Sequence, residues 1–196
     1  MQIMAGRPII RERLAIKLAV DTLRVGGVIA YPTEAVWGLG CDPHNETALL
    51  RLLSIKARSR SKGLILVASS INQFAPYLED VDVFAMNKLR ATWPGPTTWV
   101  VTHNGFAHDL VRGNHNTVAL RVSAHPVVAR LCASFGGPIV STSANISGSP
   151  PPLWSWQLRR RMGKYLDYIV SGSLGASKKP TEIRDLRSDE VLRSAS

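Results

Sequence analysis

The chain has 196 residues, of which 45% are hydrophobic and 19% charged, and its mean hydropathy is +0.02. This composition supports a packed core and excludes a wholly disordered chain. No apolar run is long enough for a transmembrane helix, and the first residues lack the apolar stretch of a signal peptide, so we expect a cytoplasmic protein. Two cysteines, Cys41 and Cys132, are too few for a disulfide framework or a zinc site.

The charge balance is strongly basic. Twenty-four Lys and Arg residues against 14 Asp and Glu residues give a formal net charge of +10 and an isoelectric point near 10.2. Such a field favours polyanionic partners, namely nucleotide phosphates, nucleic acid or an anionic membrane surface, although a basic surface also serves solubility alone. The five histidines follow no metal-ligand spacing, so we expect no resident metal.

Helices and short apolar strands alternate along the chain. A helical spacing of apolar residues over 11–25 stops at Gly26-Gly27, and a buried strand over 28–31 ends at Pro32, which lacks a ladder donor. Further helices are expected at 46–57, 71–78, 82–92, 126–135 and 154–163, and further strands at 64–68, 97–102, 117–122, 139–141, 167–170 and 190–193. The alternation predicts an α/β or α+β fold, and the lack of repeats or linkers predicts one domain over residues 1–196.

Three predicted loops carry the chemistry. Residues 31–42 combine a hydroxyl, a carboxylate and two glycines, although a structural turn explains them equally well. Residues 54–63 hold four cations, among them a Lys-x-Arg pair that suits phosphate, although a helix C-terminus also favours cations. Residues 140–148 offer hydroxyls and one amide after a strand, or form a turn that caps itself. The familiar glycine-rich nucleotide motifs are absent.

Taken together and in order, these loops resemble those of the YrdC-like family, the threonylcarbamoyl-AMP synthases. The resemblance covers almost the whole chain and rests on seven segments: residues 31–34, 56–58, 62–65, 93–97, 119–122, 141–148 and 180–185. It implies a YrdC-like fold, a single-domain twisted mixed β-sheet flanked by helices around a large basic cavity.

The resemblance also implies a reaction. Members are nucleotidyltransferases that condense L-threonine, bicarbonate and ATP to L-threonylcarbamoyladenylate and release pyrophosphate, with Mg²⁺ carried by ATP. A tRNA threonylcarbamoyl transferase complex then modifies adenosine 37 of tRNAs that read codons beginning with A. No general base is needed in outline, because the carbamate that attacks the phosphate is already an anion.

Residue roles follow from the same resemblance. Catalysis at the phosphates is assigned to Lys56 and Arg58, with Arg60 and Lys62 as further candidates. The residues expected to bind ATP are Lys56, Arg58, Ser141, Ser143, Asn145 and Arg193. Those expected to bind threonine or its carbamate are Thr33, Arg121 and Thr181.

Two other functions would also be compatible with the basic charge of the chain. A double-stranded RNA or tRNA-binding module without catalysis needs dispersed surface cations and salt-sensitive affinity. It does not need several hydroxyls in one loop, so the loop at 140–148 favours the enzyme. A hydrolase of acyl phosphates or of carbamoyl adenylates would use the same pocket in reverse and stays open.

Overall fold

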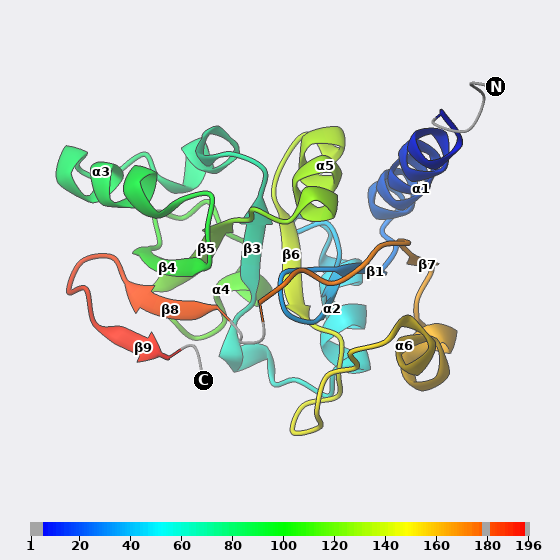
Figure 1. Cartoon of the computed structure of the whole chain (residues 1–196). Coiled ribbons are helices and arrows are strands. Elements are labelled where there is room, and N and C mark those ends of the chain that lie inside the picture. The colour runs from blue at the N-terminus through cyan, green and yellow to red at the C-terminus, as the bar shows by residue number, and fades with distance from the viewer. Residues whose placement is uncertain (1–5, 178–180, 195–196) are drawn as a thin grey trace.

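The computed structural model describes residues 6–177 and 181–194. Within these ranges the strands are β1 (Ile29–Pro32), β2 (Trp37–Gly40), β3 (Ile65–Ala68), β4 (Thr97–Thr102), β5 (Thr117–Val122), β6 (Ile139–Ser143), β7 (Tyr168–Ile169), β8 (Glu182–Asp185) and β9 (Val191–Arg193). They form one sheet in the order β7-β1-β2-β6-β3-β5-β4-β8-β9 (Figure 1). The pairs β1–β7, β3–β5 and β4–β8 are parallel and the other neighbours antiparallel, so the sheet is mixed.

Helices cover the sheet. The α-helices are α1 (Gly6–Arg24), α2 (Glu46–Ile55), α3 (Val83–Thr92), α4 (Asp109–Arg112), α5 (Pro126–Phe135) and α6 (Ser155–Met162), and short 3₁₀ helices span Arg60–Lys62, Ile71–Tyr77 and Gly163–Tyr165. Local signals set their ends. The Asn45 side chain accepts a hydrogen bond from the Ala48 amide and starts α2, while Gly136 stops α5 at a φ of 92°.

Both faces of the central strands are buried, which explains their continuous apolar sequences. On one face α1 and α5 pack against alternate strand residues such as Ile29, Val67 and Ile139. On the other face α2, α3, α4 and α6 pack against the intervening residues, such as Ala30 and Val140. Figure 1 shows α1 and α5 along one side of the sheet and α2 and α4 on the other.

The predicted fold class is confirmed, and each predicted strand and helix has a counterpart. The 71–78 segment is a 3₁₀ helix with Pro76 inside it. Five elements were not predicted, namely β2, β8, α4 and the 3₁₀ helices at Arg60–Lys62 and Gly163–Tyr165. The 31–42 segment, expected to be a loop, therefore contains a strand that pairs with β1 as a hairpin. The one-domain organisation over residues 1–196 stays a prediction. No described helix is long and apolar enough to cross a membrane.

Candidate active site

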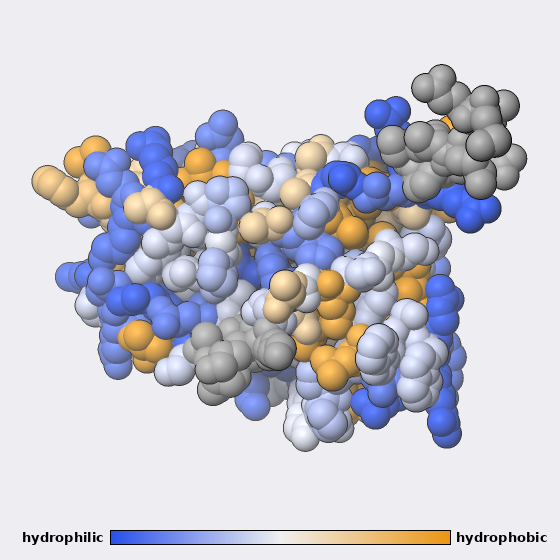
Figure 2. Space-filling model, viewed as in Figure 1, coloured by the Kyte–Doolittle hydropathy of each residue, from blue (hydrophilic) through white to orange (hydrophobic). Residues whose placement is uncertain are grey.

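A cavity of about 430 Å³ opens where the loops after β1 and β6 and the turn before β3 meet the β8–β9 hairpin. It is lined by every site residue named from the sequence except Lys56: Thr33, Arg58, Arg121, Ser141, Ser143, Asn145, Thr181 and Arg193. Hydrophilic side chains gather around a hollow near the centre of the face drawn in Figure 2. Of the further candidates, Lys62 lines the cavity, whereas Arg60 is exposed outside it.

The β6 strand and the loop after it form the polar wall of the cavity. Ser141 and Ser143 are two residues apart on β6, so their side chains point to the same side of the sheet. The Asn145 amide donates to the carbonyls of Ile146 and Ser149, over 3.0 and 2.6 Å. Its oxygen Oδ1 is buried without a partner among the described residues. This wall therefore offers two hydroxyls to a ligand, whereas both N–H groups of the Asn145 amide are engaged within the loop.

Lys56 lies beneath this loop, with 2% of its surface exposed. Its ammonium donates to the carbonyl of Ser143 and, over 2.9 Å, to that of Asn145. Burial, assisted by the positive charge of Arg58, lowers the pKa of Lys56 to about 8. The structure thus shows Lys56 holding the loop, and one of its three N–H donors is not used by these bonds.

Arg58 belongs to a tight turn between α2 and β3. Its Nε donates to the Gly63 carbonyl over 3.1 Å and its Nη2 to the Lys62 carbonyl over 3.2 Å. Gly63 has a φ of 60°, and a Cβ there would lie 2.8 Å from the Arg112 carbonyl oxygen, so only glycine fits. Burial and the charge of Arg193 both lower the pKa of Arg58.

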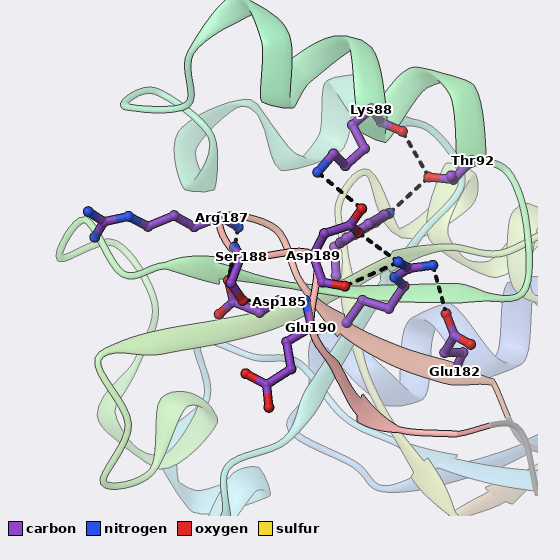
Figure 3. A network of polar contacts seen from close by, with 10 residues as sticks. Lys88, Thr92, Glu182, Asp185, Arg187, Ser188, Asp189 and Glu190 are labelled. Carbon is purple, nitrogen blue, oxygen red and sulfur yellow. Dashed lines mark hydrogen bonds and ion pairs between the residues drawn. The ribbon is translucent and has the colours of Figure 1, made fainter.

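Arg193 reaches the cavity from β9, the last strand of the sheet, and its Nη2 donates to the Thr181 carbonyl over 2.9 Å. The hairpin that carries it is anchored on α3 and β4 (Figure 3). Arg184 contacts Asp189 over 2.9 Å and lies 5.6 Å from the ring centre of Trp99. Lys88 of α3 approaches the same carboxylate at 3.6 Å. These contacts, which we call the clamp, fix the hairpin relative to the cavity.

The residues expected to bind threonine, Thr33, Arg121 and Thr181, all line the cavity. The hydroxyl of Thr33 donates to the Val36 carbonyl over 2.6 Å, and that of Thr181 lies 3.2 Å from the Thr98 hydroxyl. Arg121 pairs with Glu34 over 2.9 Å. The motif that includes Thr181 begins at Pro180, which lies outside the described residues.

Three guanidinium groups thus converge on one cavity. The charge of Arg193 lowers the pKa of Arg58, and the charge of Arg121 lowers that of Arg193, with burial the larger cause in both cases. Like charges held this close repel one another, and an anionic ligand relieves the repulsion. The site is therefore built for a molecule with several negative charges.

The sequence did not single out every residue of the site. Glu34, Arg112 and His115 also line the cavity, and Ser123 donates a hydrogen bond to the Glu34 carboxylate. Glu34 had a signal, because it stands beside Thr33 in the first motif. Ser123 had none, because an isolated serine after a strand is common in turns.

Fold and site together define an α/β protein with a cavity beside the sheet that is lined by cationic side chains. A family model described as telomere recombination, the Sua5/YciO/YrdC model, matches residues 21–195. The chain belongs to the Sua5/YciO/YrdC family.

Two relatives at the sequence level carry the same name. A protein from Chromohalobacter salexigens named threonylcarbamoyl-AMP synthase is 49% identical over 175 residues, which cover 89% of this chain and 94% of the relative. A protein of the same name from Xanthomonas euvesicatoria is 49% identical over 187 residues, which cover 93% of this chain and 98% of the relative.

Solved structures share the fold. P. abyssi Sua5 in complex with L-threonine has a TM-score of 0.84 at 29% identity, covering 91% of this chain and 53% of that one, so the present chain spans about half its length. E. coli YciO has a TM-score of 0.81 at 28% identity, covering 93% of this chain and 89% of that one.

Proposed function

We propose that the chain is a nucleotidyltransferase that forms L-threonylcarbamoyladenylate and pyrophosphate from L-threonine, bicarbonate and ATP. Curated relatives of nearly the same length are named threonylcarbamoyl-AMP synthase, and P. abyssi Sua5 was solved with L-threonine. The structural observation that carries the proposal is the convergence of Arg58, Arg121 and Arg193 on one cavity walled by hydroxyl groups.

The phosphate side of the site comprises Arg58, Arg193 and the β6 loop. Guanidinium groups bind phosphate oxygens through paired N–H donors, and the hydroxyls of Ser141 and Ser143 add donors without further charge. Lys56 holds the loop in place and brings its own positive charge beneath it. These groups neutralise the triphosphate so that a second anion can approach it.

The threonine side comprises Arg121, Thr33 and Thr181. The amine nitrogen of threonine bonds to the carbon of bicarbonate with loss of water, which leaves a carbamate anion. A carbamate oxygen then bonds to the α-phosphorus of ATP, the bond from that phosphorus to the bridging oxygen breaks, and the electron pair leaves with pyrophosphate. The guanidinium of Arg121 is suited to hold the amino acid carboxylate or the carbamate during this displacement.

We expect Mg²⁺ to bind at this site as a complex with ATP. No group of three or more His, Cys, Asp or Glu side chains among the described residues could hold a metal ion. The carboxylate of Glu34 is already engaged by Arg121 and Ser123. Phosphate oxygens and water would therefore hold the ion, which adds charge neutralisation at the triphosphate when bound.

We further propose that the adenylate passes to a tRNA threonylcarbamoyl transferase complex in the cytoplasm, which modifies adenosine 37 of tRNAs reading codons that begin with A. Direct contact of this chain with tRNA or double-stranded RNA stays a prediction from its charge. The names of the relatives favour the enzyme over a binding module without catalysis.

The test is pyrophosphate release from ATP with L-threonine and bicarbonate each present or omitted. We expect release that requires both, is abolished in Arg58→Ala and Ser143→Ala, and persists in Arg187→Ala, whose residue is exposed outside the cavity. ATP turnover without threonine would instead indicate a hydrolase. No turnover together with salt-sensitive RNA binding would indicate the binding module.

A further inference from the structure

Glu34 is an unexpected group in a cavity for anions. It is the only carboxylate among the described residues that line the cavity, whose lining also includes Arg58, Lys62, Arg112 and other cations. Burial acts to raise the pKa of Glu34, but the charge of Arg121 and the hydrogen bonds from Ser123 and Arg121 outweigh it, so the pKa lies below its ordinary value. The group is therefore an anion at neutral pH.

Each oxygen of the carboxylate has one partner. Oε2 accepts from Nη1 of Arg121 over 2.9 Å, and Oε1 accepts from the hydroxyl of Ser123 over 2.6 Å. Arg121 and Ser123 are two residues apart at the end of β5, so their side chains project from the same face and Glu34 bridges them. The pair is well shielded from water, with side-chain exposures of 7% for Arg121 and 18% for Glu34.

The backbone of Glu34 is fixed as well. Its carbonyl accepts from the Ser177 amide over 3.1 Å, and the Thr33 carbonyl accepts from the Gly175 amide over 2.9 Å. A Cβ at Gly175 would lie 2.8 Å from the Glu34 carbonyl oxygen, so the two segments touch closely. Glu34 is thus held from two other parts of the chain, by Arg121 and Ser123 at its carboxylate and by residues 175–177 at its backbone.

Arg121, in contrast, has few anchors of its own. The hydrogen bond to Glu34 is the one that its guanidinium makes to the described residues, and a guanidinium carries five N–H donors. Because Arg121 lines the cavity and none of its nitrogens is both buried and unpaired there, its other donors face the cavity space. The orientation of those donors depends on a single partner.

We propose that Glu34 is a positioning residue, which fixes the guanidinium of Arg121 so that its free N–H groups face the carboxylate or carbamate of the amino acid substrate. This inference rests on the proposed function. Compensation of the charge of Arg121 would weaken substrate binding, because an anion at this place repels an anionic substrate. The gain is orientation, since a preorganised arginine loses less freedom when the substrate binds.

A positioning role and a role in charge compensation predict opposite results for Glu34→Gln. This substitution keeps the shape of the side chain and removes its charge. If Glu34 only offset the charge of Arg121, the variant would hold the anionic substrate more tightly and the KM for L-threonine would fall. If Glu34 positions Arg121, that KM rises by about tenfold or more while the KM for ATP changes by less than about twofold.

The experiment measures both KM values by pyrophosphate release in the wild type, Glu34→Gln, Ser123→Ala and a control. Glu79→Gln makes the same chemical change at an exposed site outside the cavity and should leave both values unchanged. Ser123→Ala removes one of the two side-chain partners and should raise the threonine KM in the same direction by a smaller factor. It keeps the proposal testable if Glu34→Gln fails to fold.

A fall or no change in the threonine KM of Glu34→Gln overturns the positioning role. An equal rise in both KM values also overturns it, because that pattern indicates general damage to the site. The wild type distinguishes failure of the positioning role from failure of the proposed function. If the wild-type enzyme releases no pyrophosphate with threonine, the proposed function itself is contradicted, whatever the variants do.

Discussion

The ammonium of Lys56 donates to the backbone carbonyl of Asn145 over 2.9 Å, and also to that of Ser143, from a position with 2% exposure. A lysine almost never lies this deep without partners. Here two loop carbonyls replace water around the charge, and the loop in turn gains a fixed course along the cavity. The lysine thus links the end of α2 to the polar wall of the site.

The low pKa of Lys56 gives the first prediction. Because its pKa is lowered to about 8, Lys56 loses its positive charge above that pH. We therefore expect the KM for ATP to rise above pH 8. In Lys56→Met, which has no charge to lose, the KM for ATP should be raised at all pH values without this inflection. Steady-state kinetics across the pH range check this, and a flat wild-type profile would mean that the charge does not act on the phosphates.

The lowered pKa of Lys56 also leads to a prediction about the stability of the fold. Its pKa is lowered from 10.5 to about 8 on folding, so between these pH values the unfolded chain binds more protons than the folded chain. The contribution of Lys56 to the free energy of unfolding therefore increases as pH rises through this window, by at most about 3 kcal/mol. Urea denaturation at several pH values compares the wild type with Lys56→Met, whose curve should lack the increase.

Arg193 should matter for nucleotide binding and little for stability. We expect Arg193→Ala to raise the KM for ATP by about tenfold, because it removes one of the converging guanidiniums. Arg187→Ala is the matched control, since Arg187 is exposed on the same hairpin and points away from the clamp in Figure 3. Equal kinetics for the two variants would remove Arg193 from the nucleotide site.

A substitution at Gly63 tests the close packing of the turn that holds Arg58. Gly63→Ala should lower the free energy of unfolding by about 3 kcal/mol, because the new Cβ adds a steric clash to an unfavourable backbone conformation. Gly105→Ala is the control, since Gly105 has a φ of 94° and open space around it, and should cost about 1 kcal/mol. Thermal and urea denaturation measure both, and equal losses would show that the turn relaxes around the methyl group.

Metal binding should depend on the nucleotide. Calorimetric titration of MgCl₂ into the protein without ATP should give no saturable heat, because no described cluster of side chains could hold the ion. Removal of Mg²⁺ by a chelator should stop pyrophosphate release, and added Mg²⁺ should restore it. Saturable binding of Mg²⁺ to the protein alone would require ligands other than those described.

The sequence predicted the strands with apolar runs better than those rich in glycine or charged residues. Apolar runs gave β3, β5 and β6, because strands covered on both faces leave a continuous hydrophobic signal. The β2 strand was missed because its two glycines and the polar residues before it are also typical of a loop. The β8 strand was missed because Glu182, Arg184 and Asp185 give it a charged, half-exposed sequence.

For the site, sequence indicated residue types but not their orientations. The resemblance named Arg58, Arg121 and Arg193, although β5 and β9 are far apart in the chain, but it did not name Arg112, which lines the same cavity. The direction of the Lys56 side chain could not be predicted, because spacing along a helix end does not reveal which carbonyls fold over it. Glu34 was overlooked because its partners, Arg121 and Ser123, belong to a distant strand.

Under the proposed function, the position of Arg193 on β9 links nucleotide affinity to the local opening of the sheet. β9 is an exposed edge strand of three residues, Val191–Arg193, and edge strands of this kind open more readily than the core. Each opening withdraws one guanidinium from the cavity, so only the closed form binds nucleotide fully. ATP must then favour the closed form, and amide hydrogen exchange in β9 should slow as the nucleotide saturates the protein.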